Sequence, residues 1–270
     1  MSTVTIDRPV DITAARRPGF DRLLLAEWIK LSSVRSTWWT LAATVVLGAG
    51  LSILMCWGNA DWLASAGADE SAGSFITWGM MIAPVMAVII GAHAVTTEYG
   101  TGMIRSTFTA TPVRGRVLAA KLVVLAVVMF VVGTLTALIG YFGANPFLEN
   151  EGIGLALEGD VARAMYGSGL YLAGIAVMTA AVGFIVRHTA GTISVVLALL
   201  MVIGNMVMLV PGDLGEWLTK LMPGNAGSVI ATPDPFNPYL LDAWPGLAAF
   251  GAEIAVLLAV AWVLVRRRDA

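Results

Sequence analysis

Six long apolar runs dominate the sequence and restrict the class of fold that it can adopt. They lie at about residues 38–57, 75–95, 117–143, 161–186, 191–210 and 244–265. Each run has roughly 20 residues or more, the length that a helix needs to cross the hydrocarbon core of a bilayer. Helices are expected because each backbone group in lipid must find its hydrogen-bond partner within its own segment. The sequence therefore predicts an all-α membrane protein with six transmembrane helices.

The overall composition supports a lipid environment. Hydrophobic residues make up 58% of the chain and charged residues only 13%, a balance that leaves too little polar surface for a water-soluble domain. Tryptophan is enriched near the ends of the apolar runs, where an interfacial aromatic belt would place it. The residues concerned are Trp38, Trp39, Trp57, Trp62, Trp78, Trp217 and Trp244.

The distribution of charge between loops predicts the orientation of the chain. If the amino terminus lies inside, all but two of the 16 Lys and Arg residues fall in inner segments, and only Arg163 and Lys220 lie outside. Basic residues are retained on the cytoplasmic side of bacterial membranes, so both termini are expected there. We predict a disordered cytoplasmic tail at 1–19, a transmembrane domain at 37–265 and a second short tail at 266–270.

Residues 20–36 are predicted to form an amphipathic helix at the membrane surface. At about 100° per residue, one face collects most of the apolar side chains. That face is formed by Phe20, Leu23, Leu24, Leu31 and Val34. Glu27 falls on the apolar side, whereas Leu25 and Ile29 fall off it. We interpret the segment as an interface helix leading into the membrane, with a solvated charged helix as the alternative.

The segment between the second and third runs is a basic loop that contains its own helical pattern. It carries one acid and four bases, namely Glu98, Arg105, Arg114, Arg116 and Lys121. After Gly102, apolar and small side chains recur at helical spacing at Met103, Ile104, Thr107 and Phe108. This pattern predicts a short amphipathic helix at the cytoplasmic membrane surface, ended by Pro112 and Gly115.

The segment 211–243 is expected to lie outside and contains five prolines. Within it, Leu214–Met222 is predicted to form one or two helical turns, with Leu214, Trp217, Leu218 and Leu221 on one side. We expect this piece to dip into the outer membrane boundary, and a proline-rich external loop is the alternative.

Few polar side chains fall within the predicted spans. Glu253 lies near the middle of the last span, where an ionisable group should face other helices or a cavity. Asn205 is expected to tie helices together, and His93 to be a satisfied interfacial histidine rather than a proton carrier. Pro84 is expected to kink the second span.

Motifs for independent catalysis are absent from the sequence. It contains no Gly-x-x-x-x-Gly-Lys-Ser/Thr phosphate-binding loop and no Gly-x-Ser-x-Gly elbow. With only His93, His188 and Cys56, it also lacks the residues for a zinc or metalloprotease site. We therefore predict that the chain is not an enzyme and binds no cofactor or metal, and we expect no nucleic-acid partner.

Two segments resemble a known family. One reads Glu27-Trp28-Ile29-Lys30-Leu31 ahead of the first span. The other reads Glu98-Tyr99-Gly100-Thr101-Gly102 and is followed by Pro112, Arg114, Arg116 and Lys121. Together with the predicted topology, they are similar to the permease subunit of type-2 ATP-binding-cassette (ABC) exporters, of the small bacterial six-span type. The resemblance covers about residues 20–268.

The resemblance implies an assembly and roles for particular residues. It implies a bacterial plasma-membrane permease dimer that works with two cytoplasmic ATPase subunits, which would bind ATP and Mg²⁺. The ATPase-coupling element would contain Glu98, Tyr99, Gly100, Thr101, Gly102, Ile104, Arg105 and Phe108. The interface helix would use Glu27, Trp28, Lys30 and Arg35. The segment 211–243 would correspond to the family's re-entrant outer helices.

Two functional interpretations follow. In the first, the chain is the permease of an ATP-driven exporter for an amphipathic or drug-like molecule, a peptide or a lipid. In the second, it works without an ATPase, either as a carrier coupled to protons through Glu253 or as a structural membrane anchor. The basic loop after Glu98 favours the first, because a proton-coupled carrier is expected to hold more ionisable groups within its spans.

Overall fold

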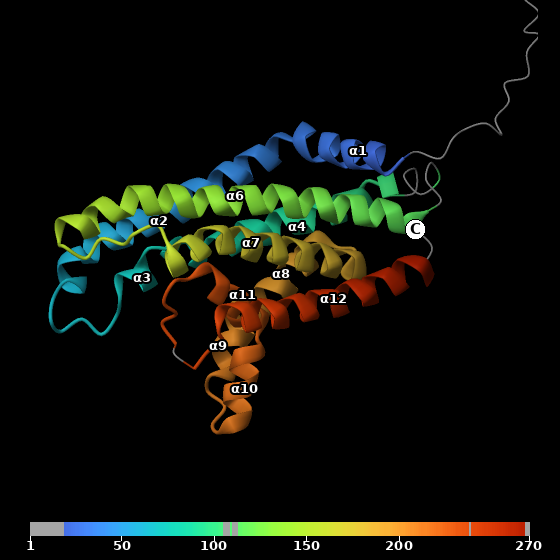
Figure 1. Ribbon diagram of the computed structural model, residues 1–270. Coiled ribbons are helices and arrows are strands. Elements are labelled where there is room, and N and C mark those ends of the chain that lie inside the picture. The colour runs from blue at the N-terminus through green and yellow to red at the C-terminus, as the bar shows by residue number, and fades with distance from the viewer. Residues whose placement is uncertain (1–18, 105–108, 110–112, 238, 268–270) are drawn as a thin grey trace, which may run out of the picture.

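The computed structural model describes residues 19–104, 109, 113–237 and 239–267, and all regular elements within these ranges are helical (Figure 1). The tail predicted at 1–19 lies outside them except for Gly19. The first elements are α1 (Phe20–Ser33), α2 (Arg35–Leu63), α3 (Ala72–Phe75), the 3₁₀ helix η2 (Trp78–Met81) and α4 (Ala83–Gly100). The middle of the chain forms α6 (Arg114–Asn150), α7 (Gly159–Val186), α8 (Thr189–Leu197), the π-helix η3 (Ala198–Ile203) and α9 (Gly204–Val207). The last elements are α10 (Asp213–Leu221), α11 (Pro223–Ser228), the 3₁₀ helix η4 (Val229–Ala231) and α12 (Ala243–Arg267).

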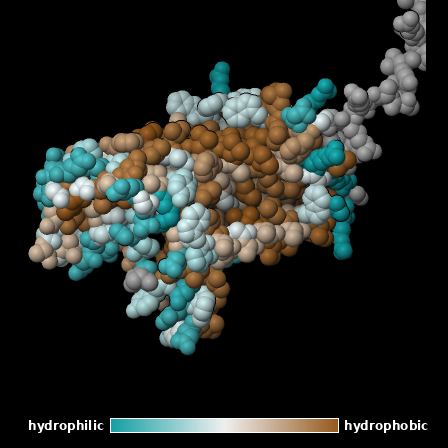
Figure 2. All heavy atoms as spheres, in the orientation of Figure 1, coloured by the Kyte–Doolittle hydropathy of each residue, from teal (hydrophilic) through white to brown (hydrophobic). Residues whose placement is uncertain are grey.

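Within the described chain, five helices are long and apolar enough to cross a membrane. They are Arg35–Leu63, Arg114–Asn150, Gly159–Val186, Thr189–Val207 and Ala243–Arg267, at the predicted first, third, fourth, fifth and sixth spans. Figure 2 shows apolar side chains over the middle of the bundle and hydrophilic ones toward its ends. On α6 an exposed apolar ridge recurs every four residues, at Val123, Val127, Val131, Leu135 and Ile139. A continuous exposed ridge of this kind requires lipid or protein around it rather than water.

The prediction of one continuous second span at 75–95 is wrong in detail. The region is divided between the end of α3, the 3₁₀ turn η2 and α4, which begins only at Ala83. Pro84 therefore lies in the first turn of α4 and does not kink it, since a proline there removes no helical hydrogen bond. The break is fixed by α2, where the Ser52 hydroxyl accepts a hydrogen bond from the Gly79 amide at 2.9 Å.

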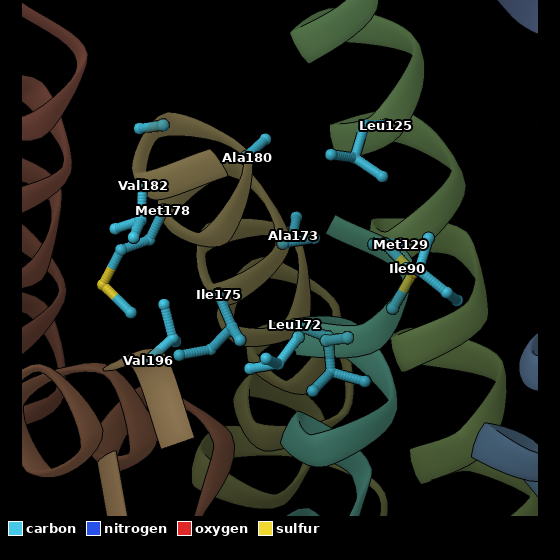
Figure 3. Close-up of a cluster of buried hydrophobic side chains, with 14 of the residues drawn as sticks. Ile90, Leu125, Met129, Leu172, Ala173, Ile175, Met178, Ala180, Val182 and Val196 are labelled. Carbon is cyan, nitrogen blue, oxygen red and sulfur yellow. The ribbon is translucent and has the colours of Figure 1, made fainter. Parts of the chain in front are cut away.

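Helix α7 is the central element of the bundle. Leu172, Ile175 and Met178 are fully buried, and Figure 3 shows their side chains between α4, α6, α8 and α12. Small residues on α7 let its neighbours approach closely. A side chain at Gly169 would meet the backbone of α6, and one at Gly174 would meet the ring of Phe250 on α12. Close helix packing through small residues is the usual way in which membrane helices associate.

The segment predicted as an outer loop is largely helical. The turns predicted at Leu214–Met222 form α10, which projects from the side of the bundle (Figure 1). The chain then returns to the bundle, where Ile230 of η4 is fully buried. Arg163 of α7 binds this returning segment. Its guanidinium donates to the carbonyls of Val229, Ile230 and Thr232 at 3.1–3.3 Å. Sequence analysis assigned Arg163 only to the outer side and did not predict this role.

The contact between η2 and α2 leads to a prediction about stability. A Cβ atom at Gly79 would overlap the carbonyl of Gly48, whereas one at Gly50 would meet nothing within 4 Å. We expect Gly79→Ala to lower the free energy of unfolding by about 1–3 kcal/mol through overpacking. The control Gly50→Ala should be neutral or stabilising by up to about 1 kcal/mol. Unfolding in mixed micelles would measure both, and equal stability of the two variants would contradict the close contact.

Candidate functional site

Four charged side chains from three helices meet at one end of the bundle. Lys30 of α1 contacts Glu27 Oε1 at 2.7 Å and Glu98 Oε1 of α4 at 2.9 Å. Lys121 of α6 contacts Glu27 Oε2 at 2.5 Å and Glu98 Oε1 at 2.9 Å. We call Glu27, Lys30, Glu98 and Lys121 the charge cluster. It joins the helix before the first span to the end of α4 and the beginning of α6.

The charge cluster is withdrawn from water. Glu27, Glu98 and Lys121 are only 6%, 2% and 6% exposed. Two carboxylates and two ammonium groups balance one another, which offsets the cost of burying each charge. Glu27 lies on the apolar side of its helix, which is irregular in the sequence. The structure explains this position, because that side of α1 packs on α6 and Glu27 pairs there with Lys121. Glu98 is therefore buried within the bundle and is not a solvated acid.

Lys30 is the most accessible member of the charge cluster. Partial burial opposes its charged form, but hydrogen bonds and charges from Glu27 and Glu98 outweigh that effect and raise the pKa of the ammonium. A raised pKa in the folded state means that the stabilisation is fully present at neutral pH and is lost only as the pH rises through that value. The cluster is thus intact over the physiological range.

The residues next to Glu98 connect α4 to the turn between α7 and α8. The guanidinium of Arg187 lies 4.9 Å from the ring centre of Tyr99. The hydroxyls of Thr96 and Thr189 are 2.7 Å apart and share a hydrogen bond. Arg187 adopts a left-handed conformation with φ 58° at the end of α7. These contacts attach the end of α4 to the central helix.

The beginning of α6 is likewise attached to the end of α12. Arg114 Nη1 donates to the carbonyl of Val265 at 2.9 Å. A cation at the carboxyl end of a helix satisfies carbonyls that have no partner within the helix. The two helices that flank the loop after Glu98 therefore contact α1, α7 and α12.

The structure places the remaining residues of the predicted coupling element at the end of α4. Gly100 ends α4 and Thr101 follows as its cap. Of the two glycines, only Gly102 adopts a positive φ, of 72°, so the tight turn depends on this residue. Ile104 is buried, whereas Arg105 and Phe108 lie outside the described residues, as does most of the predicted short helix. Glu98 belongs to α4 and pairs with Lys30 and Lys121 of its own chain.

The predicted helix at 20–36 is shorter than expected. It ends at Ser33, and Val34 has an extended conformation with ψ 117°. Arg35 therefore begins α2 and is not part of α1, which corrects the prediction for this residue. The bend is held by Trp38, whose indole donates to the carbonyl of Ser32 at 2.8 Å. Trp28 is exposed.

The three polar residues predicted within the spans lie apart from one another. His93 is exposed, and its Nδ1 bonds to the carbonyl of Ile89 at 2.8 Å. Asn205 is also exposed, and its amide donates to the carbonyl of Met201 in the same span rather than to another helix. Glu253 of α12 is half-buried, and its Oε2 has no hydrogen-bond partner among the described residues.

A cavity of about 220 Å³ lies beside the charge cluster, between α1, α2, α4 and α6. Its polar part includes Lys30, Glu98, Thr40, His93 and Thr97, and its apolar part includes Ile89, Ile90, Val124 and Leu125. The sequence analysis did not identify this cavity because its walls come from separate parts of the chain. Only the unusual position of Glu27 indicated that α1 has a polar contact on its apolar side.

The described residues contain no group of three or more His, Cys, Asp or Glu side chains placed to hold a metal ion. What the site offers is a mechanical connection between helices and a small amphipathic cavity. With five helices long and apolar enough to cross a membrane, the described chain is of the class of multi-pass helical membrane proteins.

The comparison with known families identifies the class further. The family described as "ABC-2 family transporter protein" matches residues 23–205, which is most of the chain. The chain therefore belongs to the ABC-2 family of transporter membrane proteins. A search of curated proteins found no match.

The charge cluster leads to a prediction that separates buried from exposed ion pairs. Lys121→Met leaves two buried carboxylates with one ammonium, so we expect a loss of about 3–5 kcal/mol in unfolding free energy. The control Asp160→Asn removes the partner of Arg163, and because Asp160 is 74% exposed the change should stay within about 1 kcal/mol. The double variant Glu98→Gln/Lys121→Met removes one charge of each sign and should recover part of the loss. A single variant as stable as the control would contradict the buried cluster.

Proposed function

We propose that the chain is the permease subunit of an ATP-driven exporter and works with a separate cytoplasmic ABC ATPase. Membership of the ABC-2 family supports this proposal. The observation that carries it further is the charge cluster, which joins α1, α4 and α6 where the loop after Glu98 begins and ends. The cargo proposed is an amphipathic or drug-like molecule, a peptide or a lipid.

We propose further that the chain crosses a bacterial plasma membrane six times, with both termini in the cytoplasm. The sixth crossing would be α4, continued by η2 and α3. The distribution of Lys and Arg supports this orientation, since it places the basic loop after Glu98 and the end of α12 on the same side. In Figure 1, α1, the beginning of α6 and the end of α12 lie at one end of the bundle.

The proposed mechanism is the transmission of movement from the ATPase through the loop after Glu98. A push on this loop would act on the ends of α4 and α6, which the charge cluster holds to α1. The contacts of Tyr99 with Arg187 and of Arg114 with Val265 would pass it to α7 and α12. Packed helices move as rigid bodies, so a displacement at their ends would shift the spans along their whole length.

ATP and Mg²⁺ would be bound by the ATPase, because the sequence contains no phosphate-binding loop of its own. We propose a permease dimer, in keeping with the prevalence of twofold symmetry among oligomers. Affinity purification of the tagged chain from its native membranes, with identification of any ATPase that co-purifies, tests this assembly. Robust ATP hydrolysis by the isolated homogeneous permease would contradict the division of roles.

The turn at Gly102 allows a direct test of coupling. Gly102→Val places a branched side chain at a positive φ, which is strongly disfavoured and should alter the path of the loop. Gly152→Val is the matched control, because Gly152 also has a positive φ, of 75°, and open space around it, but lies between α6 and α7, outside the predicted coupling element. We expect Gly102→Val to insert and bind the ATPase but to export about tenfold less than the control, a loss corresponding to roughly 1.4 kcal/mol of coupling.

The measurements are membrane insertion, capture of the ATPase and ATP-driven uptake into inverted vesicles, which reports export because the cytoplasmic face is outermost. Equal export by Gly102→Val and Gly152→Val, with equal expression, would show that the turn does not couple the ATPase to the spans. Loss of insertion in Gly102→Val alone would assign the loop a topological role instead.

The alternative function, a proton-coupled carrier, is favoured by one observation, the carboxylate oxygen of Glu253 that has no partner among the described residues. Glu253→Gln preserves shape and removes the titratable group, so a carrier of this kind should lose its dependence on the proton gradient. Export that depends on ATP and is unchanged by Glu253→Gln would support the exporter and exclude the carrier. Uptake or efflux driven by a pH gradient without any ATPase would support the carrier.

A further inference from the structure

We propose that the beginning of α6 and the end of α12 together bind the phosphate group of an anionic phospholipid, at a site made by Arg116, Arg266 and the indole of Trp262. We call these three residues the arginine site. None of them belongs to the charge cluster, and in Figure 1 the two helix ends lie at the same end of the bundle. The binding requires neither an ATPase nor transport, so the inference goes beyond the proposed function and does not rest on it.

The indole of Trp262 joins the two helices. A Cβ atom at Gly115 would overlap the ring of Trp262, so the ring lies directly against the backbone of α6. On α12, the guanidinium carbon of Arg266 lies 4.3 Å from the centre of the same ring, a distance typical of a cation–π contact. Arg116 directly follows Gly115, so its side chain begins next to the ring. Arginines from two helices therefore share one indole.

A hydrogen bond holds the same two helix ends together. Arg114 Nη1 donates to the carbonyl of Val265, the residue before Arg266, at 2.9 Å. The contact with Trp262 in addition restricts the side chain of Arg266. A site whose parts are positioned before binding loses less conformational entropy when its ligand arrives. The arginine site is in this sense prepared for a ligand.

The positive charges of the arginine site have no acidic partner among the described residues. Arg116 and Arg266 are exposed, and neither takes part in the ion pairs of the described chain. The only acid on α12 is Glu253, more than three helical turns before Arg266. The acids of the charge cluster are engaged by Lys30 and Lys121. Clustered cations without acids beside them attract an anion from their surroundings.

The arginine site lies where the apolar surface of the spans ends. The apolar run of α6 begins directly after Arg116, and that of α12 ends directly before Arg266. Exposed apolar side chains continue from both, at Val123 on α6 and at Val263 on α12. Arginine and tryptophan side chains at this level of a membrane meet the head groups of the lipids. A phospholipid matches both parts of the surface, because its acyl chains cover the apolar side chains while its phosphate meets the arginines.

The chemistry of the side chains selects the head group. A guanidinium presents its N–H donors in a planar fork that matches two oxygens of a phosphate. Two arginines more than balance the single charge of a phosphodiester, so a further cation in the head group would be repelled. The arginine site therefore favours phosphatidylglycerol over phosphatidylcholine, which carries the same phosphate beside a quaternary ammonium.

The experiment titrates the full-length chain in neutral detergent micelles with phosphatidylglycerol or with phosphatidylcholine of the same acyl chains. Native mass spectrometry counts the bound lipids. We expect the first phosphatidylglycerol to bind about tenfold more tightly than the first phosphatidylcholine, because anionic lipid gains from each arginine near it. This advantage should shrink as the salt concentration rises from about 0.05 to about 0.5 M, since salt screens exposed charges. Equal affinity for the two lipids would overturn the proposal.

Variants matched in chemistry test the location. Arg266→Gln removes one charge of the arginine site, and Arg22→Gln removes one exposed charge of α1 at the same end of the bundle. We expect the affinity for phosphatidylglycerol to fall about threefold in Arg266→Gln and about tenfold in Arg116→Gln/Arg266→Gln, and to stay within about twofold of the wild type in Arg22→Gln. Equal losses in Arg266→Gln and Arg22→Gln would overturn the site, because they would show attraction to the overall charge alone. If a variant does not fold, the lipid preference of the unmodified chain still decides the proposal.

Two further measurements identify the source of the phosphate. Glycerol 3-phosphate in large excess should not displace phosphatidylglycerol, because it lacks acyl chains to cover α6 and α12. Displacement at equal concentration would assign the site to a soluble phosphate and overturn the lipid.

The same variants separate this site from the proposed exporter. If Arg116→Gln/Arg266→Gln keeps its affinity for phosphatidylglycerol but no longer captures an ATPase, the surface docks a protein and the proposal is overturned. Loss of the lipid preference in this variant supports the site whether or not export continues. A wild-type chain that prefers phosphatidylglycerol but has no ATPase partner would count against the exporter alone.

Discussion

Burial of opposite charges in a mostly apolar bundle is the constraint on which the described architecture depends. Glu27, Glu98 and Lys121 are almost fully buried. Each of these charges would cost several kcal/mol to bury without an opposite charge beside it, so none is stable there without the others. Because the members belong to α1, α4 and α6, their mutual neutralisation fixes where α1 meets the two longer helices. Apolar contacts alone allow helices in lipid to slide or rotate at little cost, and a buried polar cluster removes that freedom.

The rest of the bundle is specified by small side chains rather than by charge. Helix α7 is surrounded by α4, α6, α8 and α12, and glycines on its faces let these neighbours approach. The π-helix at Ala198–Ile203 interrupts the span that follows α7. Farther along the chain, Arg163 of α7 binds the carbonyls of Val229 and Ile230, where the chain returns to the bundle. Rigid packing around α7 would allow movement imposed at the charge cluster to spread, because well-packed interfaces respond as units.

Much of this fold is predictable from hydropathy and helical periodicity. Five of the six apolar runs form helices long enough to cross a membrane, and the turns predicted at Leu214–Met222 form α10. The broken second span was missed because hydropathy does not register that Gly79 lies against the backbone of Gly48. The sequence analysis named Glu27, Lys30, Glu98 and Lys121 separately. It did not predict that their side chains contact one another. Sequence separation conceals such a contact, which arises only once three helices are packed together.

Glu98 belongs both to the charge cluster and to the end of α4, where the loop after it begins. If an ATPase pushes this loop, the displacement acts on a carboxylate whose Oε1 accepts from both Lys30 and Lys121. Thermodynamic linkage then requires reciprocity: an event among the spans that changes the position of Glu98 changes the affinity for the ATPase by the same factor by which the ATPase changes the equilibrium of that event. Because the two lysines bond one carboxylate oxygen and belong to α1 and α6, a displacement of Glu98 acts on both helices together with α4.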